Sequence, residues 1–137
     1  MNINEEKYLE IKPGQLEQSR ELAEKISLIL DDKKAGQVKI IETSRQTIIA
    51  DYFVIATGTS STHIRSLAGE VEFSLEGTGR TPSRVSGLES NDWIILDYDS
   101  VLVHIFNSEA RDYYKLERLW GDGESVNIEE ILKAQEK

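Results

Sequence analysis

The sequence predicts a single domain of the α/β class, and three observations lead to this prediction. A β-branched apolar run, IIADYFVIATGT, leads through a Gly-containing turn into a segment with the apolar spacing of a helix. A strand that enters a helix in this way is typical of α/β folds. The predicted elements follow the order helix, strand, strand, helix, strand, hairpin, helix. The length of 137 residues fits one hydrophobic core.

The first half of the chain predicts two helices and two strands. A helix is predicted over residues 15–34, because apolar residues recur at spacings of three and four, and Gly36 is expected to end it. The runs Val38 to Ile41 and Ile48 to Ala56 predict strands. The second strand leads into a helix from about Ser60 to Leu75, whose apolar residues share one face.

The second half predicts an edge strand, a hairpin and a helix. Thr81 to Val85 is expected to lie at a sheet edge, because Pro82 lacks a backbone N–H. Trp93 to Asp97 and Val101 to Phe106 are two apolar runs around a short polar turn, which predicts a β-hairpin.

A final helix is predicted to begin after a cap at Asn107 or Ser108 and to continue to about Trp120. Tyr113 and Leu116 share the helical spacing of Trp120. Residues 128–133 predict a further helical turn or two.

One face of the hairpin is a candidate docking surface. If Tyr98 opposes Val101 across the turn, alternation of side chains places six residues on one face, whereas another loop length would reverse the pairing. These six are Trp93, Ile95, Asp97, Leu102, His104 and Phe106. Such an apolar face suits a protein partner. The alternative is that helices cover both faces of the sheet.

Composition narrows the class of function. The chain has 25 acidic and 16 basic residues, a net charge of −9, which argues against extensive nucleic-acid binding and favours a basic protein partner, although solubility alone also explains such a charge. The absence of cysteine excludes disulfides, thiolate metal sites and a cysteine nucleophile. Neither a membrane span nor a secretory signal is expected, so we expect a cytoplasmic protein.

Four features could carry chemistry. The turn at Gly58 could hold a phosphate at a helix N-terminus, but its Thr and Ser residues are also ordinary helix caps. Asp97 and Asp99 could hold Mg²⁺, which together with the Gly58 turn would suggest a nucleotidyltransferase; a plain polar turn explains the same residues. His104 is expected to be structural, with a hydrogen bond to Asp97. His63 is expected at the surface or partly packed.

Two segments resemble the signature blocks of the Iojap-like ribosomal silencing factors. They are DYFVIATGTSSTHIRSLAGEV, residues 51–71, and WIILDYDSVLVHIFNSEARDYYKLERLW, residues 93–120. The resemblance implies a mixed β-sheet flanked by helices, with nucleotidyltransferase-like topology but without catalytic apparatus. It covers roughly residues 15–121, which leaves an N-terminal extension, 1–14, and an acidic C-terminal extension, 122–137.

The resemblance implies a binding protein and not an enzyme, with no cofactor and no metal. The implied partner is the large ribosomal subunit, bound through the ribosomal protein uL-fourteen on its intersubunit face, with little direct nucleic-acid contact. Binding would block joining of the small subunit and so repress translation when nutrients are limiting. Related proteins in organelles act in large-subunit assembly. A nucleotidyltransferase and a homodimeric scaffold remain as alternatives.

Residues that match the family's motifs are carried over as candidates for binding the ribosomal protein, with Trp93 as the first choice of anchor. The face residues Ile95, Leu102 and Phe106 join them as part of the same candidate surface. The full set is Trp93, Ile95, Asp97, Tyr98, Leu102, His104, Phe106, Glu109, Arg111, Tyr114, Leu119 and Trp120. The family often has Gly after the Tyr of the turn, where this chain has Asp99, so we expect a slightly different turn conformation.

Overall fold

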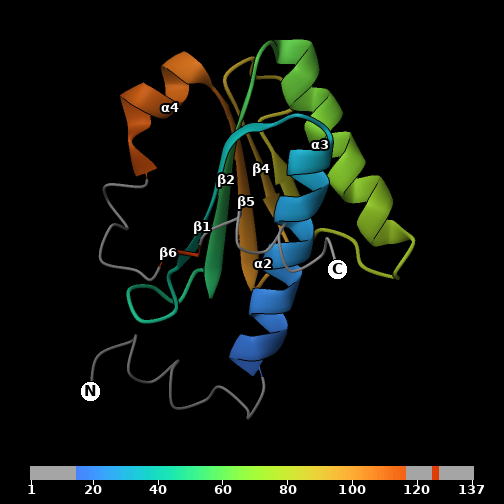
Figure 1. The fold of residues 1–137 in the computed structure, drawn as a ribbon, viewed down its shortest axis with the longest axis vertical. Coiled ribbons are helices and arrows are strands. Elements are labelled where there is room, and N and C mark those ends of the chain that lie inside the picture. Colours follow the sequence, from blue (N-terminus) through green and yellow to red (C-terminus); the bar gives the residue numbers. More distant parts are fainter. Residues whose placement is uncertain (1–14, 117–124, 127–137) are drawn as a thin grey trace.

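A six-stranded mixed β-sheet forms the centre of the fold, as the computed structural model shows (Figure 1). The structure describes residues 15–116 and 125–126. The elements are α2 (Gln15–Asp32), β1 (Gly36–Glu42), β2 (Tyr52–Gly58), α3 (Ser61–Glu76), β3 (Arg84–Ser86), β4 (Trp93–Asp97), β5 (Val101–Asn107), α4 (Ser108–Tyr114) and β6 (Ser125–Val126). The α/β class with a mixed, helix-flanked sheet is therefore confirmed.

The strand order is β3-β4-β5-β2-β1-β6, and the two central strands are its only parallel pair among the described residues. Tyr52 of β2 pairs with Val101 of β5, and Gly58 pairs with Asn107 at the other end. Every residue of β2 is buried, as expected for a strand covered on both faces. β6 lies within residues 122–137, where the sequence predicted an extension, and pairs with β1 at the sheet edge.

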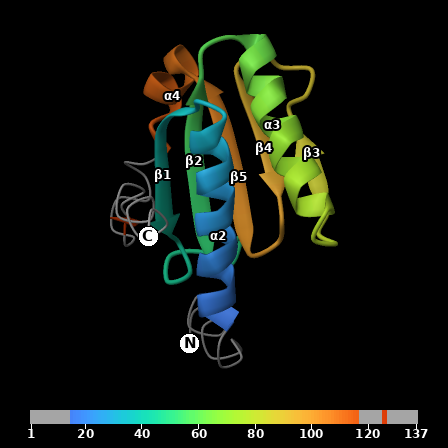
Figure 2. The ribbon, with the colours of Figure 1, turned by 45° about the vertical axis from the view of Figure 1, so that its right-hand side comes forward.

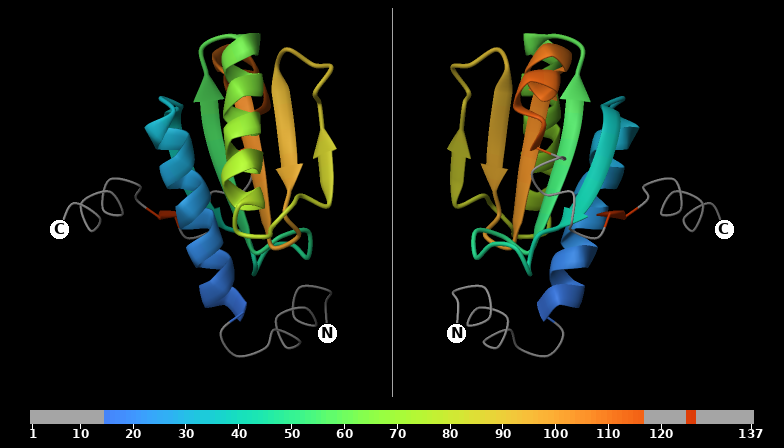
Figure 3. Two further views of the ribbon diagram at one scale, coloured as in Figure 1. Left: turned by 90° about the vertical axis from the view of Figure 1, so that its right-hand side faces the viewer. Right: turned by 90° about the vertical axis from the view of Figure 1, so that its left-hand side faces the viewer.

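The two long helices cover one face of the sheet. α2 and α3 lie side by side on this face (Figures 2 and 3), and their apolar residues pack with the larger core cluster of the sheet. On the opposite face a second cluster contains Phe53, Ile55, Leu102 and Phe106, and the short helix α4 packs over one end of it (Figure 1). The opposite face is thus covered by a described helix at one end only.

α3 follows its sequence signals closely. The Ser60 side chain accepts the N–H of His63 at the N-terminus, and Gly77 is the C-terminal cap. The strand enters the helix through Gly58, where a Cβ atom would lie only 2.8 Å from Cγ1 of Ile64. Glycine therefore lets β2 and the first turn of α3 approach closely.

α2 ends differently from the prediction. Lys34 adopts a left-handed conformation, with φ of 68°, and the N–H of Ala35 donates to the carbonyl of Leu30. This is the pattern of a C-terminal cap. Gly36 was wrongly predicted as the stop and instead begins β1.

The predicted start of β2 at Ile48 is also wrong. The carbonyl of Thr43 accepts the N–H of Thr47, and the hydroxyl of Thr43 donates to the carbonyl of Ala50. The chain between Thr43 and Ala50 therefore turns instead of extending. Ile48 and Ile49 are 49% and 60% exposed. Their apolar character resembled a strand, but these backbone and side-chain hydrogen bonds decide the local conformation.

α4 is shorter than predicted. Asn107 caps it as expected, by accepting the N–H of Ala110. Lys115 has a φ of 50° and donates its N–H to the carbonyl of Arg111, which ends the helix after Tyr114. Leu119, Trp120 and the predicted helical turn at residues 128–133 lie outside the described residues. No helix in the described part of the chain is long and apolar enough to cross a membrane.

Candidate functional site

The register of the hairpin places six of the predicted residues on one face of the sheet. Trp93 pairs with Phe106, Ile95 with His104, and Asp97 with Leu102, and the N–H of Tyr98 donates to the carbonyl of Val101. Residues paired in an antiparallel ladder point to the same side. The predicted sharing of this face is confirmed, and it is the face that α4 covers at one end.

Trp93 is held on three sides. Its indole Nε1–H donates a hydrogen bond of 3.1 Å to Nδ1 of His104. Its ring stacks on Phe106, with centroids 4.8 Å apart, and meets Tyr114 of α4 at 4.7 Å. The side chain remains partly exposed. Trp93 is therefore an oriented aromatic side chain at a surface.

His104 is 4% exposed, and burial lowers its pKa from 6.5 to about 4. The imidazole is therefore neutral near pH 7. Since an indole nitrogen can only donate, Nδ1 must be the acceptor and Nε2 must carry the proton. The prediction of a hydrogen bond from His104 to Asp97 is wrong, because His104 pairs with Trp93 and Asp97 instead accepts the N–H of Asp99 at 2.8 Å.

The Asp97 to Ser100 turn is stabilised by its own polar groups. The Asp97 carboxylate accepts the Asp99 N–H, and the Asp99 carboxylate accepts the Ser83 hydroxyl at 3.0 Å. Asp99 has a φ of 65°, a left-handed conformation that favours Gly and that Asp also tolerates.

The structure does not assemble the nucleotidyltransferase site. The Asp97 to Asp99 turn precedes Val101 at one end of β5, whereas Gly58 pairs with Asn107 at the other end. Six strand residues at about 3.3 Å each separate the two by roughly 20 Å. No group of three metal-ligating side chains occurs among the described residues.

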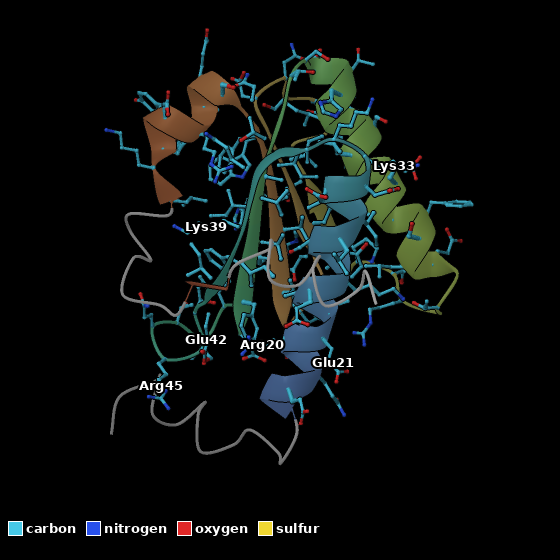
Figure 4. The ribbon with its side chains drawn as sticks, viewed as in Figure 1. Arg20, Glu21, Lys33, Lys39, Glu42 and Arg45 are labelled. Atoms are coloured by element: carbon cyan, nitrogen blue, oxygen red, sulfur yellow. The ribbon has the colours of Figure 1, made fainter. Side chains whose placement is uncertain are left out.

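Polar groups of the Gly58 turn are used inside the protein. Ser60 accepts the N–H of His63, and the Thr59 N–H donates to Nδ1 of His63 at 2.9 Å. Nε2 of His63 lies 3.2 Å from the carbonyl oxygen of Lys33, at the end of α2 beside α3 (Figure 4). His63 is partly buried. The turn therefore caps α3 and joins it to α2, which favours the capping interpretation.

The other candidate residues divide between surface and interior. Glu109 and Tyr114 are exposed, and Ile95 and Asp97 are partly buried. Leu102 and Phe106 are buried. Arg111 is buried and donates to the Gln37 carbonyl and, at 2.9 Å, to the Thr57 hydroxyl, so it fastens α4 to the sheet.

Tyr98 lies apart from the other hairpin candidates. It is 4% exposed and packs with the core on the α2 and α3 side of the sheet. Its hydroxyl has no hydrogen-bond partner among the described residues. Burial, with a smaller contribution from the charge of Glu72, raises its pKa to about 12.

We expect Tyr98→Phe to leave the free energy of unfolding unchanged or to raise it by about 1 kcal/mol. A buried hydroxyl without a partner loses its hydration and gains nothing in return. Urea unfolding followed by circular dichroism measures the change. A decrease of 1 kcal/mol or more would show that the hydroxyl has a partner in solution.

Sequence reasoning did not select Tyr113 and Asp92. Tyr113 is 81% exposed and meets Tyr114 edge-on, with centroids 5.1 Å apart. Both tyrosines line a cavity of about 270 Å³ together with Asp92, Asn107, Glu109 and Ala110. The partly or fully exposed residues here form the Trp93 surface, defined as Asp92, Trp93, Ile95, Glu109, Tyr113 and Tyr114.

Comparisons with known proteins agree on one protein family. A family model described as "Ribosomal silencing factor during starvation" matches residues 16–137. The chain is 36% identical over 103 residues to a ribosomal silencing factor of Halalkalibacterium halodurans, a match that covers 75% of this chain and 88% of the relative. It is 27% identical over 95 residues to a mouse protein named "Mitochondrial assembly of ribosomal large subunit protein 1", covering 67% of this chain and 42% of that protein.

Solved structures agree with the sequence matches. A crystal structure of a Chromobacterium violaceum protein superposes with a TM-score of 0.69 at 31% identity and covers 77% of this chain and 86% of that one. A Bacillus halodurans structure gives a TM-score of 0.66 at 31% identity, with 81% and 98% covered.

Proposed function

Because the chain belongs to the family of ribosomal silencing factors, we propose that it binds the large ribosomal subunit and blocks joining of the small subunit. The contact is a ribosomal protein on the intersubunit face, uL-fourteen, and the result is repression of translation when nutrients are limiting. The observation that carries this proposal is the Trp93 surface, where an oriented, partly exposed indole contacts Tyr114. Tyr114 in turn lines a cavity with Tyr113 and the carboxylates Asp92 and Glu109. The name of the mouse relative, which refers to the large subunit, supports the choice of subunit.

The chemistry of the Trp93 surface fits a basic protein. Aromatic side chains near the centre of an interface commonly contribute most of the binding energy. Asp92 and Glu109 beside them can pair with lysine or arginine at the rim. The net charge of −9 adds attraction at long range.

The proposed mechanism is steric occlusion, which requires only that the bound domain occupy space on the intersubunit face and involves no chemical step. A bound domain on the intersubunit face prevents the small subunit from occupying the same volume. The competing enzyme hypothesis requires the Gly58 turn and the Asp97 to Asp99 turn to act together, and their separation by roughly 20 Å along β5 speaks against it.

Trp93→Ala is expected to weaken co-sedimentation with purified large subunits at least tenfold, because truncating a central aromatic anchor costs about 2 kcal/mol or more. The same variant should lose inhibition in a subunit-joining assay. Circular dichroism should stay close to that of the wild type, since Trp93 is partly exposed.

Phe73→Ala is the matched control. Phe73 is 76% exposed on α3, which covers the opposite face of the sheet, so its removal should leave ribosome binding unchanged. Wild-type binding by Trp93→Ala would refute the anchor, and equal losses in both variants would indicate a general effect on folding. A protein that never co-sediments with either subunit would refute the function itself.

A further inference from the structure

Among the residues that the structure describes, the hydrogen bond to His104 is the only polar contact of the Trp93 indole, and it faces inward. His104 lies one strand away, on β5, and is 4% exposed. Its ring packs beside Phe53, at a centroid distance of 4.7 Å, and stacks with Phe106 at 6.2 Å and an interplanar angle of 10°. These aromatic contacts restrict rotation of the imidazole in the packed interior.

We propose that His104 is a positioning residue for the docking surface, a neutral imidazole whose Nδ1 holds the Trp93 indole in the orientation that meets the partner. This inference rests on the proposed function, in which Trp93 is the anchor. Because the single polar atom of the indole is bonded within the protein, the exposed part of the ring is apolar. A partner group therefore contacts the indole through its ring, by apolar packing or by a cation over the ring face, and other basic groups of the partner are directed to Asp92 and Glu109 at the rim.

The energetic cost of His104 supports a role beyond packing. Its Nε2 is buried and has no hydrogen-bond partner among the described residues. Leaving such a group unpaired is unfavourable, and an apolar side chain of similar volume would avoid it. Burial also keeps the ring neutral over the physiological range, so that Nδ1 remains an acceptor. The gain that offsets this cost is the fixed orientation of Trp93.

Four variants of the full chain test the inference by their affinity for large ribosomal subunits. His104→Leu removes the acceptor and is expected to weaken binding about tenfold, the equivalent of one hydrogen bond. His104→Asn places an oxygen near the position of Nδ1 and is expected to bind within about threefold of the wild type. Trp93→Phe has no N–H to position, so adding His104→Leu to it should have no further effect. A loss of about tenfold in that background also would overturn the inference, because it would show a role independent of the indole.

A spectroscopic measurement on the wild type does not depend on the folding of His104→Leu. The two Trp residues give two indole N–H resonances, and Trp93→Phe identifies the one that belongs to Trp93. We expect this resonance to be shifted downfield and protected from solvent exchange, and the His104 imidazole to be protonated at Nε2 only. An imidazole protonated at Nδ1 would overturn the inference even if His104→Leu did not fold.

The outcomes separate this inference from the function on which it rests. If Trp93→Ala loses binding while His104→Leu binds like the wild type, the positioning role is wrong and the docking surface stands. If Trp93→Ala binds like the wild type, the docking surface is wrong and the role of His104 in binding fails with it.

Discussion

Gly87→Ala is expected to lower the free energy of unfolding by about 3 kcal/mol, from left-handed backbone strain and steric overlap together. Gly87 has a φ of 85°, and a Cβ atom at this position would overlap the carbonyl oxygen of Trp93. The overlap is with backbone, so no side chain can move aside to relieve it. The strand that carries Trp93 must shift, and ribosome binding should fall as well. Denaturant unfolding measures the first effect and co-sedimentation the second.

Gly79→Ala is the control that separates the backbone strain of Gly87→Ala from its steric overlap. Gly79 has almost the same φ, 83°, but no atom lies within 4 Å of the position of a Cβ. Its substitution should cost only the strain, about 1 kcal/mol, and should leave binding unchanged. Equal destabilisation by the two variants would mean that the contact with Trp93 relaxes easily, contrary to the expected rigidity of this part of the sheet.

Acidification from pH 6.5 to pH 4 is expected to remove about 3 kcal/mol of stability through His104 alone. In the unfolded chain this imidazole takes up a proton near pH 6.5, whereas burial delays protonation in the folded protein until about pH 4. Between these values the unfolded state binds more protons, so the free energy of unfolding decreases as the pH falls. The loss is complete below about pH 4.

His104→Asn provides the reference for this measurement. The charged groups on the same sheet face, including Asp97 and Lys39, and the other histidine, His63, are present in both proteins. The difference in pH slope between wild type and variant in urea unfolding therefore isolates His104. Parallel slopes between pH 4 and 6.5 would show that the folded protein protonates His104 at an ordinary pKa.

The sequence predicted those elements whose local signals and tertiary environment agree. α3 has a Ser60 cap, an apolar face and Gly77 at its end, and the structure uses all three. The errors occur where tertiary contacts or hydrogen bonds override the local pattern. Lys34 adopts a conformation that favours Gly, and Ile48 is apolar but lies in an exposed turn. Composition alone does not reveal either outcome.

Much of the candidate site followed from strand alternation. A two-residue periodicity and the pairing of Tyr98 with Val101 were enough to place Trp93 and His104 on one face. The same alternation places Tyr98 on the other face from Asp97, so the sequence pattern itself argues against Tyr98 as a docking residue. The hydrogen bond between Trp93 and His104 could not be predicted from the sequence, because it depends on side-chain rotamers and not on strand register.

The parallel pairing of β2 with β5 also determines when this protein can fold during its own synthesis. Tyr52 meets Val101, which is 49 positions later in the chain. At about 5 to 20 residues per second, roughly 2 to 10 seconds pass between the synthesis of the two partners. During that time β2, which is apolar on both faces, can pair with β1 on one edge, but its other edge has no partner and is prone to aggregation. Slower initiation, which reduces crowding of nascent chains, should therefore raise the soluble yield.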